Sequence, residues 1–74
     1  MAPLRPLPYR EVKRRLEAAG FRFYSQRGSH AKFIREEADG IRVVIVPVHK
    51  EIAVGTLRSI LRQAGLSPEA FERL

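Results

Sequence analysis

The stretch Ile41-Arg42-Val43-Val44-Ile45-Val46 restricts the fold more than any other part of the sequence. Every residue in it except Arg42 is β-branched, and β-branched residues favour the extended backbone of a strand. Pro47 follows and ends the strand, because proline has no N–H to donate to a neighbouring strand. A run that is apolar on both faces is typical of a strand covered on both sides. We therefore predict a strand over residues 41–46 in a central or well-covered position.

Two segments before this run are predicted to be its partner strands. Residues 21–24 alternate and are rich in aromatic side chains, which favours a strand, and residues 25–28 have the composition of a turn. A second strand is expected over residues 30–35. Alternation would place His30, Lys32 and Ile34 on one face and Ala31, Phe33 and Arg35 on the other. Residues 36–40 form a polar loop ending in Asp-Gly, a hairpin signal, so the three strands should run antiparallel.

Helical patterns flank the three strands. Apolar residues three and four apart form one stripe before the strands (Tyr9, Val12, Leu16, Ala19) and another after them (Leu57, Ile60, Leu61, Ala64). Pro8 suits the first turn of the earlier helix, and Gly20 is predicted to end it in a left-handed conformation. The later helix is predicted to begin around Gly55-Thr56, with Thr56 as its N-cap, and to stop at Gly65. A short terminal helix is predicted from Ser67-Pro68-Glu69.

This order predicts an α+β fold. Three strands joined by hairpins can bury one face beneath two helices, which gives a two-layer α-β-β-β-α domain with a short C-terminal helix. The double-stranded-RNA-binding domain has the same arrangement. We expect a single domain over residues 1–74, in which residues 1–7 form an extended proline-rich tail. The chain has no cysteine, so the stability of this small domain must come from apolar burial.

Charge is the most informative bulk property. Lysine and arginine number 14 against 8 acidic residues, which gives a net charge of +6. A small basic domain of this kind usually binds nucleic acid or an acidic protein.

No apolar run approaches the length of a membrane span, and the proline-containing N-terminus lacks the apolar region of a signal peptide. We therefore expect a cytoplasmic protein without membrane association.

The triplet Gly28-Ser29-His30 is the leading candidate for chemistry. Histidine is the side chain best suited to proton transfer near neutral pH, and glycine allows another molecule to approach the backbone closely. Arg27 and Lys32 flank the triplet and would attract a phosphate. The motif therefore suggests phosphodiester chemistry, with an ordinary hairpin turn and a surface histidine as the alternative.

Metal-dependent and serine-hydrolase chemistry are both disfavoured. Asp39 is the sole aspartate, Glu36 and Glu37 would point to opposite faces of a strand, and two histidines without cysteine do not make a zinc site. No carboxylate is identifiable to orient a Ser29–His30 pair. We expect no metal and no cofactor.

For a phosphodiester of RNA, a metal-free cleavage mechanism would fit these residues. The ribose 2′-hydroxyl is the nucleophile, and His30 would serve as general base or acid. Lys32 and Arg27 are candidates for stabilising charge on the phosphorus, while the backbone at Gly28 and Ser29 could lie against the phosphate. His49 is either a second catalytic group or a residue that only binds RNA or caps the neighbouring helix, and Lys50 beside it is a candidate phosphate ligand.

Four segments together resemble the HicA family of small bacterial toxins, also called YcfA-like mRNA interferases. They are residues 16–21 (LEAAGF), Gly28-Ser29-His30 with Phe33, residues 46–49 (VPVH) and residues 55–66 (GTLRSILRQAGL), in this order and spacing. The resemblance implies a dsRBD-like fold and an endoribonuclease that cleaves mRNA as the toxin of a type II toxin–antitoxin system. It places the catalytic histidine at His30 and implies a HicB-type antitoxin that binds the toxin and masks this residue.

Two other functions are compatible with the composition. In a non-catalytic RNA-binding module, the arginines would bind phosphates and His30 would only form hydrogen bonds. In a protein-interaction domain, the basic surface would serve an acidic partner and bind RNA negligibly at physiological salt. Cleavage of RNA would distinguish the endoribonuclease from both of these alternatives.

Overall fold

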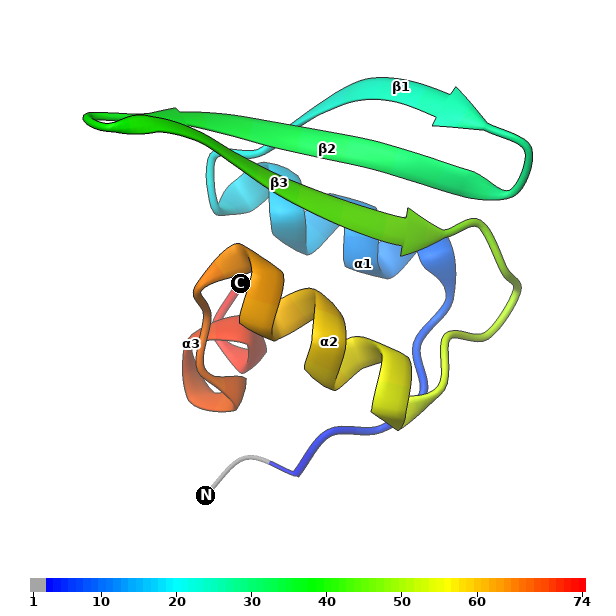
Figure 1. The fold of residues 1–74 in the computed structure, drawn as a ribbon. Coiled ribbons are helices and arrows are strands. Elements are labelled where there is room, and N and C mark those ends of the chain that lie inside the picture. The colour runs from blue at the N-terminus through cyan, green and yellow to red at the C-terminus, as the bar shows by residue number, and fades with distance from the viewer. Residues whose placement is uncertain (1–2) are drawn as a thin grey trace.

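The computed structural model describes residues 3–74 and shows a sheet with helices on one of its faces (Figure 1). The elements are α1 (Tyr9–Ala18), β1 (Arg22–Arg27), β2 (His30–Glu37), β3 (Gly40–Pro47), α2 (Val54–Ala64) and α3 (Pro68–Glu72). The sheet is antiparallel, and α1 and α2 lie beneath the same face of it. The predicted two-layer α-β-β-β-α fold with a short C-terminal helix is therefore confirmed. Within residues 3–74, no helix covers the opposite face, which we call the open face (Figure 1).

The core lies between the sheet and the helices. Its largest fully buried side chains come from the strands (Phe33, Val44, Val46), from α1 and α2 (Val12, Leu16, Leu57, Ile60), from the β3–α2 connection (Ile52) and from α3 (Phe71). Burying one such side chain stabilises the fold by about 1.5–3 kcal/mol relative to leaving it in water. The four from α1 and α2 belong to the two stripes that the sequence predicts, so hydrophobic periodicity identifies the buried faces of these two helices correctly.

The predicted position of the β-branched strand is wrong. The strand order is β1-β2-β3, so β3 is an edge strand and β2 is central. Val44 and Val46 point into the core and are fully buried, whereas Ile41, Val43 and Ile45 are 62%, 41% and 37% exposed. The free edge of β3 lies against α2, where the Ile45 N–H donates to Gln63 Oε1 at 2.8 Å. One side chain of α2 therefore bonds to this edge, while the outer side chains of β3 stay exposed.

The turn before His30 is shorter than predicted. Residues 25–27 belong to β1 and pair with residues 30–32 of β2, so the turn consists of Gly28 and Ser29 alone. A bulge between Phe23 and Ser25 shifts the register, which a sequence pattern of period two does not reveal. Gly28 has φ +58°, in agreement with the positive φ that a two-residue II′ hairpin needs at its first position.

The helix boundaries are partly as predicted. Gly20 and Gly65 follow α1 and α2 with φ values of +95° and +71°, and the Ser67 hydroxyl accepts a hydrogen bond from the Ala70 N–H at 3.0 Å. Thr56, however, is not the N-cap of α2, because that helix begins at Val54 after Ala53. Ala53 makes no side-chain cap, and Ile52 just before it pairs with a distant segment.

That distant segment is the end of the predicted N-terminal tail. The Ile52 N–H donates to the Leu7 carbonyl at 2.7 Å, and the Leu7 N–H donates to the Ile52 carbonyl at 3.2 Å. Leu7 is buried in the core, so the proline-rich segment contributes a core residue. Residues 1 and 2 of this segment lie outside the described residues.

Several arginines stabilise the fold. Arg35 Nη1 donates to the Ala19 carbonyl at 2.8 Å, and Arg42 Nη1 donates to the Gln63 carbonyl at 3.3 Å, so arginines from the sheet reach the C-terminal ends of α1 and α2. Cations are favourable there because carbonyls at a helix end lack partners within the helix. Glu37 pairs with both arginines at 2.8 Å.

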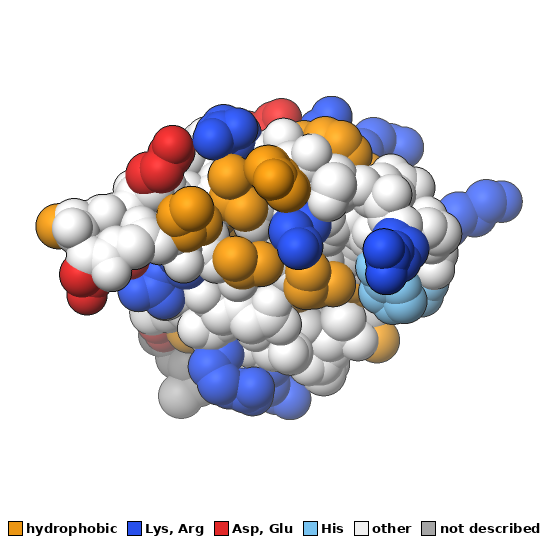
Figure 2. Space-filling model, turned by 45° about the horizontal axis from the view of Figure 1, so that its top comes forward, with side chains coloured by type: hydrophobic (Ala, Val, Ile, Leu, Met, Phe, Trp, Pro, Cys, Tyr) orange, Lys and Arg blue, Asp and Glu red, His pale blue; other side chains and the backbone are white. Residues whose placement is uncertain are grey.

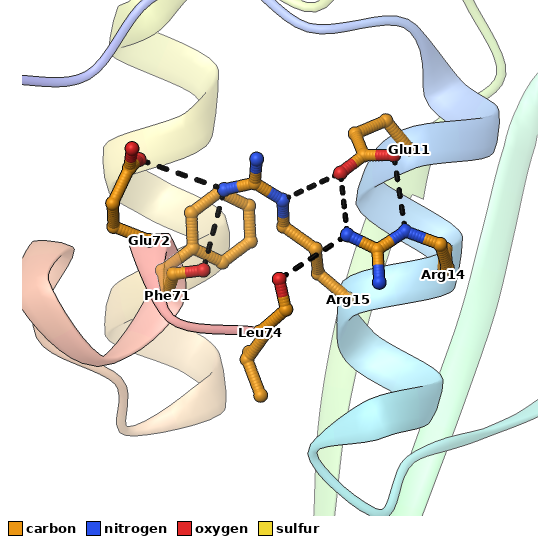
Figure 3. Close-up of polar contacts among 6 residues, drawn as sticks. All are labelled: Glu11, Arg14, Arg15, Phe71, Glu72 and Leu74. Atoms are coloured by element: carbon orange, nitrogen blue, oxygen red, sulfur yellow. Dashed lines mark hydrogen bonds and ion pairs between the residues drawn. The ribbon is translucent and has the colours of Figure 1, made fainter.

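A buried arginine, Arg15, links α1 to α3 (Figure 3). Its Nε donates to Glu11 at 2.8 Å, its Nη1 donates to the Phe71 carbonyl at 3.2 Å, and its guanidinium lies 4.8 Å from the centroid of the Phe71 ring. Glu72 is a further ion-pair partner at 3.8 Å. Because burying a charge is costly without partners, this set of contacts makes the position of α3 specific.

We expect stability to fall in acid partly because of Glu11. Hydrogen bonds from Arg14 and Arg15 lower its pKa from 4.5 to about 2. A carboxyl with a depressed pKa contributes stability above its unfolded-state pKa, and this contribution is lost as the pH falls from 4.5 towards 2. In urea unfolding at several pH values, Glu11→Gln should lose less stability over this range than the wild type. Glu51→Gln, a change at an exposed residue, should follow the wild type, and parallel curves for all three proteins would contradict the expectation.

Candidate active site

The predicted catalytic histidine lies on the open face, at the first position of β2. Ala31 and Phe33 are fully buried on the core side, so strand alternation directs His30 and Lys32 to the open face, as predicted. Ile34 shares their side of the strand but is buried, at 6% exposed. In the register of the sheet, His30 lies between Arg27 of β1 and Pro47 of β3. The next outward row consists of Ser25, Lys32 and Ile45.

These two rows form a hollow of about 350 Å³. Its lining residues are Ser25, Arg27, His30, Lys32 and Ile45, which we call the His30 hollow. Figure 2 shows histidine atoms beside lysine or arginine side chains at one end of this face. The structure therefore brings together the imidazole and two cations that the sequence singles out. His30 and Arg27 are exposed, so a substrate in solution can reach them.

Gly28 and Ser29 form the turn beside this hollow. Gln26 Nε2 donates to the Gly28 carbonyl at 2.9 Å, and the Val48 N–H donates to the Ser29 carbonyl at 2.7 Å. A Cβ built on Gly28 would meet no atom within 4 Å, so the space over the turn is open. The turn is therefore held from both sides and accessible from outside, which suits close approach of a phosphate to its backbone.

His49 and Lys50 do not line the His30 hollow. They line a second, shallower hollow of about 620 Å³ together with Pro8, Tyr9, Arg10 and Val48. The Tyr9 N–H donates to the His49 carbonyl at 3.2 Å, which holds this loop at the start of α1. Burial is the main cause that raises the pKa of the Tyr9 hydroxyl, so this group remains protonated at neutral pH. The predicted site residues are thus separated: Arg27, His30 and Lys32 line one hollow, His49 and Lys50 line the other, and Gly28 and Ser29 line neither.

Sequence reasoning misses Ser25 and Ile45 as lining residues of the His30 hollow. Both lie in the same outward row as Lys32, and the pairing of three strands places them there. The position of Ser25 is not predicted because the bulge in β1 breaks the alternation of the strand. The position of Ile45 is not predicted because the apolar sequence of β3 suggests a buried residue there. Tyr9 and Arg10 of the second hollow are missed because α1 and the β3–α2 connection meet only in the tertiary structure.

The described residues offer no cluster suited to a metal ion. Within residues 3–74, no group of three histidine, cysteine, aspartate or glutamate side chains is close enough to hold one. The lining of the His30 hollow carries arginine and lysine, which repel a divalent cation and attract an anion. No helix in the same part of the chain has the length and apolar character needed to cross a membrane.

Comparison with known proteins identifies the family and agrees with the fold. A family model described as the HicA toxin of bacterial toxin–antitoxin systems matches residues 9–66, which run from the start of α1 to just beyond α2 and include Gly28-Ser29-His30. No curated protein matches the sequence. With most of its length covered by that match, the chain belongs to the HicA toxin family of bacterial toxin–antitoxin systems.

Proposed function

We propose that this toxin is a metal-independent endoribonuclease that cleaves mRNA in the cytoplasm, with His30 as its proton-transfer group. The single observation that carries the proposal is the His30 hollow, in which one exposed imidazole shares the lining with Arg27 and Lys32. An anionic phosphodiester fits these cations, and the open space over the Gly28 turn admits the strand that contains it.

The chemistry is an intramolecular displacement. The ribose 2′-oxygen loses its proton and forms a bond to phosphorus, the bond from phosphorus to the 5′-oxygen breaks, and that oxygen takes up a proton. The products are a 2′,3′-cyclic phosphate and a 5′-hydroxyl. His30 transfers one of these protons, and Arg27 and Lys32 stabilise the negative charge that builds up on the phosphoryl oxygens.

The second hollow extends the binding surface along the RNA. His49 and Lys50 are exposed on it, and Arg10 adds a further positive charge. The hydrogen bond between Val48 and Ser29 fixes this loop beside the turn of the His30 hollow. We assign these residues to binding of phosphates next to the cleaved one, and we assign proton transfer to His30 alone.

The test is incubation of the purified chain with single-stranded RNA in the presence of EDTA. We expect cleavage products that end in a 2′,3′-cyclic phosphate. An RNA with 2′-deoxy or 2′-O-methyl sugars should remain intact, because the nucleophile is then missing. Intact unmodified RNA would contradict the proposal.

A second candidate is a non-catalytic RNA-binding module. It is favoured by the observation that the His30 hollow holds only one side chain suited to proton transfer near neutral pH. In that case the EDTA incubation would leave unmodified RNA uncut, while RNA would be retained in a salt-sensitive manner.

Removing the cations of the hollow should weaken RNA binding and its salt dependence. The measurement is the affinity for 2′-O-methyl RNA, which cannot be cleaved, over a range of salt concentrations. Each lost phosphate contact lowers the magnitude of the logarithmic salt slope by about 0.7 for a single strand, so Arg27→Ala/Lys32→Ala should lower it by about 1.4. Arg58→Ala/Arg62→Ala removes two exposed arginines of α2, outside both hollows, and should change the slope little. Equal slopes for the two double variants would contradict the assignment.

A further inference from the structure

The second hollow has an aromatic ring in its lining, whereas the His30 hollow is lined by no phenylalanine, tyrosine or tryptophan. It lies where the connection between β3 and α2 runs beside the start of α1 (Figure 1), and the Tyr9 N–H donates to the His49 carbonyl there at 3.2 Å. Its lining combines apolar side chains (Pro8, Tyr9, Val48) with basic ones (Arg10, His49, Lys50). An aromatic ring next to cations suits a nucleotide, whose base is flat and whose phosphate is an anion.

We propose that the second hollow binds one unpaired nucleobase of the RNA, which stacks on the Tyr9 ring beside the phosphodiester that is cleaved. The proposal rests on the proposed function for its substrate class, RNA. It adds a base-binding subsite to the phosphate contacts of the second hollow, with Tyr9 as the residue that selects an unpaired nucleotide.

The Tyr9 ring is held in place before any ligand binds. It is partly buried and packs against the hydrophobic core, where its centroid lies 6.4 Å from that of the fully buried Phe33 ring. The same burial raises the pKa of its hydroxyl. Because the ring is already fixed, a base that stacks on its accessible part orders few additional side-chain torsions, which keeps the entropic cost of binding low.

The cations of the second hollow are free to bind phosphates. Within residues 3–74, neither Arg10 nor Lys50 forms an ion pair with a carboxylate, whereas Arg14 and Arg15 of the same helix as Arg10 both pair with Glu11. Single-stranded nucleic acid is bound by this combination of cations along the backbone and aromatic rings under the bases. Phosphate contacts explain the cations of the hollow, and base stacking explains its ring.

The second hollow is one step along the chain from the His30 hollow. Pro47 is the register partner of His30, and Val48 and His49 follow it directly. The Val48 N–H also donates to the Ser29 carbonyl at 2.7 Å, so the rims of the two hollows are joined. An RNA strand that places a phosphate beside His30 can therefore place a neighbouring base over Tyr9. That base must be unpaired, because bases within a duplex are stacked on their neighbours and proteins stack on bases of single-stranded segments.

The experiment measures the affinity of the full chain for two oligomers of equal length at one salt concentration. One is a 2′-O-methyl RNA, and the other is built of abasic nucleotides, which keep the phosphates but have no bases and no 2′-hydroxyl. Tyr9→Leu keeps an apolar side chain but removes the ring. We expect it to bind the 2′-O-methyl RNA about 5- to 150-fold more weakly than the wild type, the range for loss of one base–aromatic stack. The two proteins should bind the abasic oligomer equally.

Two control variants separate stacking from other effects. Tyr9→Phe keeps the ring and should bind both oligomers as the wild type does. Tyr24→Leu removes a tyrosine that is 59% exposed and lines neither hollow, and it should also bind as the wild type does. The proposal is wrong if Tyr9→Phe loses as much affinity as Tyr9→Leu, if Tyr24→Leu loses as much, or if Tyr9→Leu weakens binding of both oligomers equally.

A readout on the wild type needs no variant that might fold poorly. In spectra of ring-labelled protein, the Tyr9 ring resonances should shift upfield when the 2′-O-methyl RNA binds, because a stacked base shields them, and should shift much less with the abasic oligomer. Tyr9 resonances that respond alike to both oligomers would overturn the proposal. None of these measurements involves cleavage. Unmodified RNA left intact in EDTA would therefore overturn the proposed function and leave the base-binding result standing.

Discussion

Replacing His30 with alanine is expected to lower the rate of RNA cleavage by about 10²- to 10⁴-fold, the usual contribution of a general acid or base. His30 is the one histidine in the lining of its hollow, whose charged side chains are otherwise arginine and lysine, and histidine is the residue type best suited to proton transfer. RNA affinity should change little, since Arg27 and Lys32 remain. Expression of the His30→Ala chain without its antitoxin should likewise permit growth that the wild-type chain arrests.

His49→Ala is the matched control for this result. It removes the other histidine, which lies in the second hollow with Tyr9 and Arg10. We expect weaker RNA binding with a rate of the cleavage step close to that of the wild type, measured in single-turnover conditions. Undiminished cleavage by His30→Ala, or an equal loss in His49→Ala, would show that the assignment of proton transfer to His30 is wrong.

Replacing Phe71 with alanine should produce the largest loss of stability among single changes in the C-terminal part. The ring is 1% exposed and packs in the core, so its removal leaves a cavity and costs about 3–5 kcal/mol. It also removes the cation–π contact that helps to hold the buried Arg15 guanidinium. A total stability of 5–15 kcal/mol is usual for a protein domain, so this loss is a large fraction of it.

The measurement is the free energy of unfolding in urea, with Phe23→Ala as the control. Phe23 is the same residue type but is 43% exposed, so its truncation should cost clearly less. α3 has five residues and cannot persist as an isolated helix, so Phe71→Ala should also make the segment after Gly65 sensitive to proteases. Equal costs for the two variants would mean that α3 does not contribute to the core as described.

Local patterns predict most elements of this fold. The stripes ending in Ala19 and Ala64 give both long helices, because a helix repeats every 3.6 residues and buries one face. Gly65 and Ser67 mark helix ends through backbone geometry and a side-chain cap, and both act within one turn of the chain. The start of α2 is missed because no side chain caps it, and the residue before its N-cap, Ile52, pairs with Leu7, far away in sequence.

Some residues of the candidate site can also be predicted from local sequence, and others cannot. Arg27, His30 and Lys32 are close in sequence, so the local motif is enough to bring them together. Ser25 and Ile45 join them only through the register of three strands, and the register of β1 depends on a bulge. His49 is separated from His30 because the β3–α2 connection turns towards α1, where Tyr9 binds its backbone.

By itself, the sequence determines the order of elements, the buried faces of the helices and the cationic histidine motif, because each depends on contacts within a few residues. The tertiary structure decides that β3 lies at the edge with its outer side chains uncovered, because strand order and helix placement depend on contacts between distant segments. That decision places the exposed side chains of Ile41, Val43 and Ile45 on the same open face as the His30 hollow.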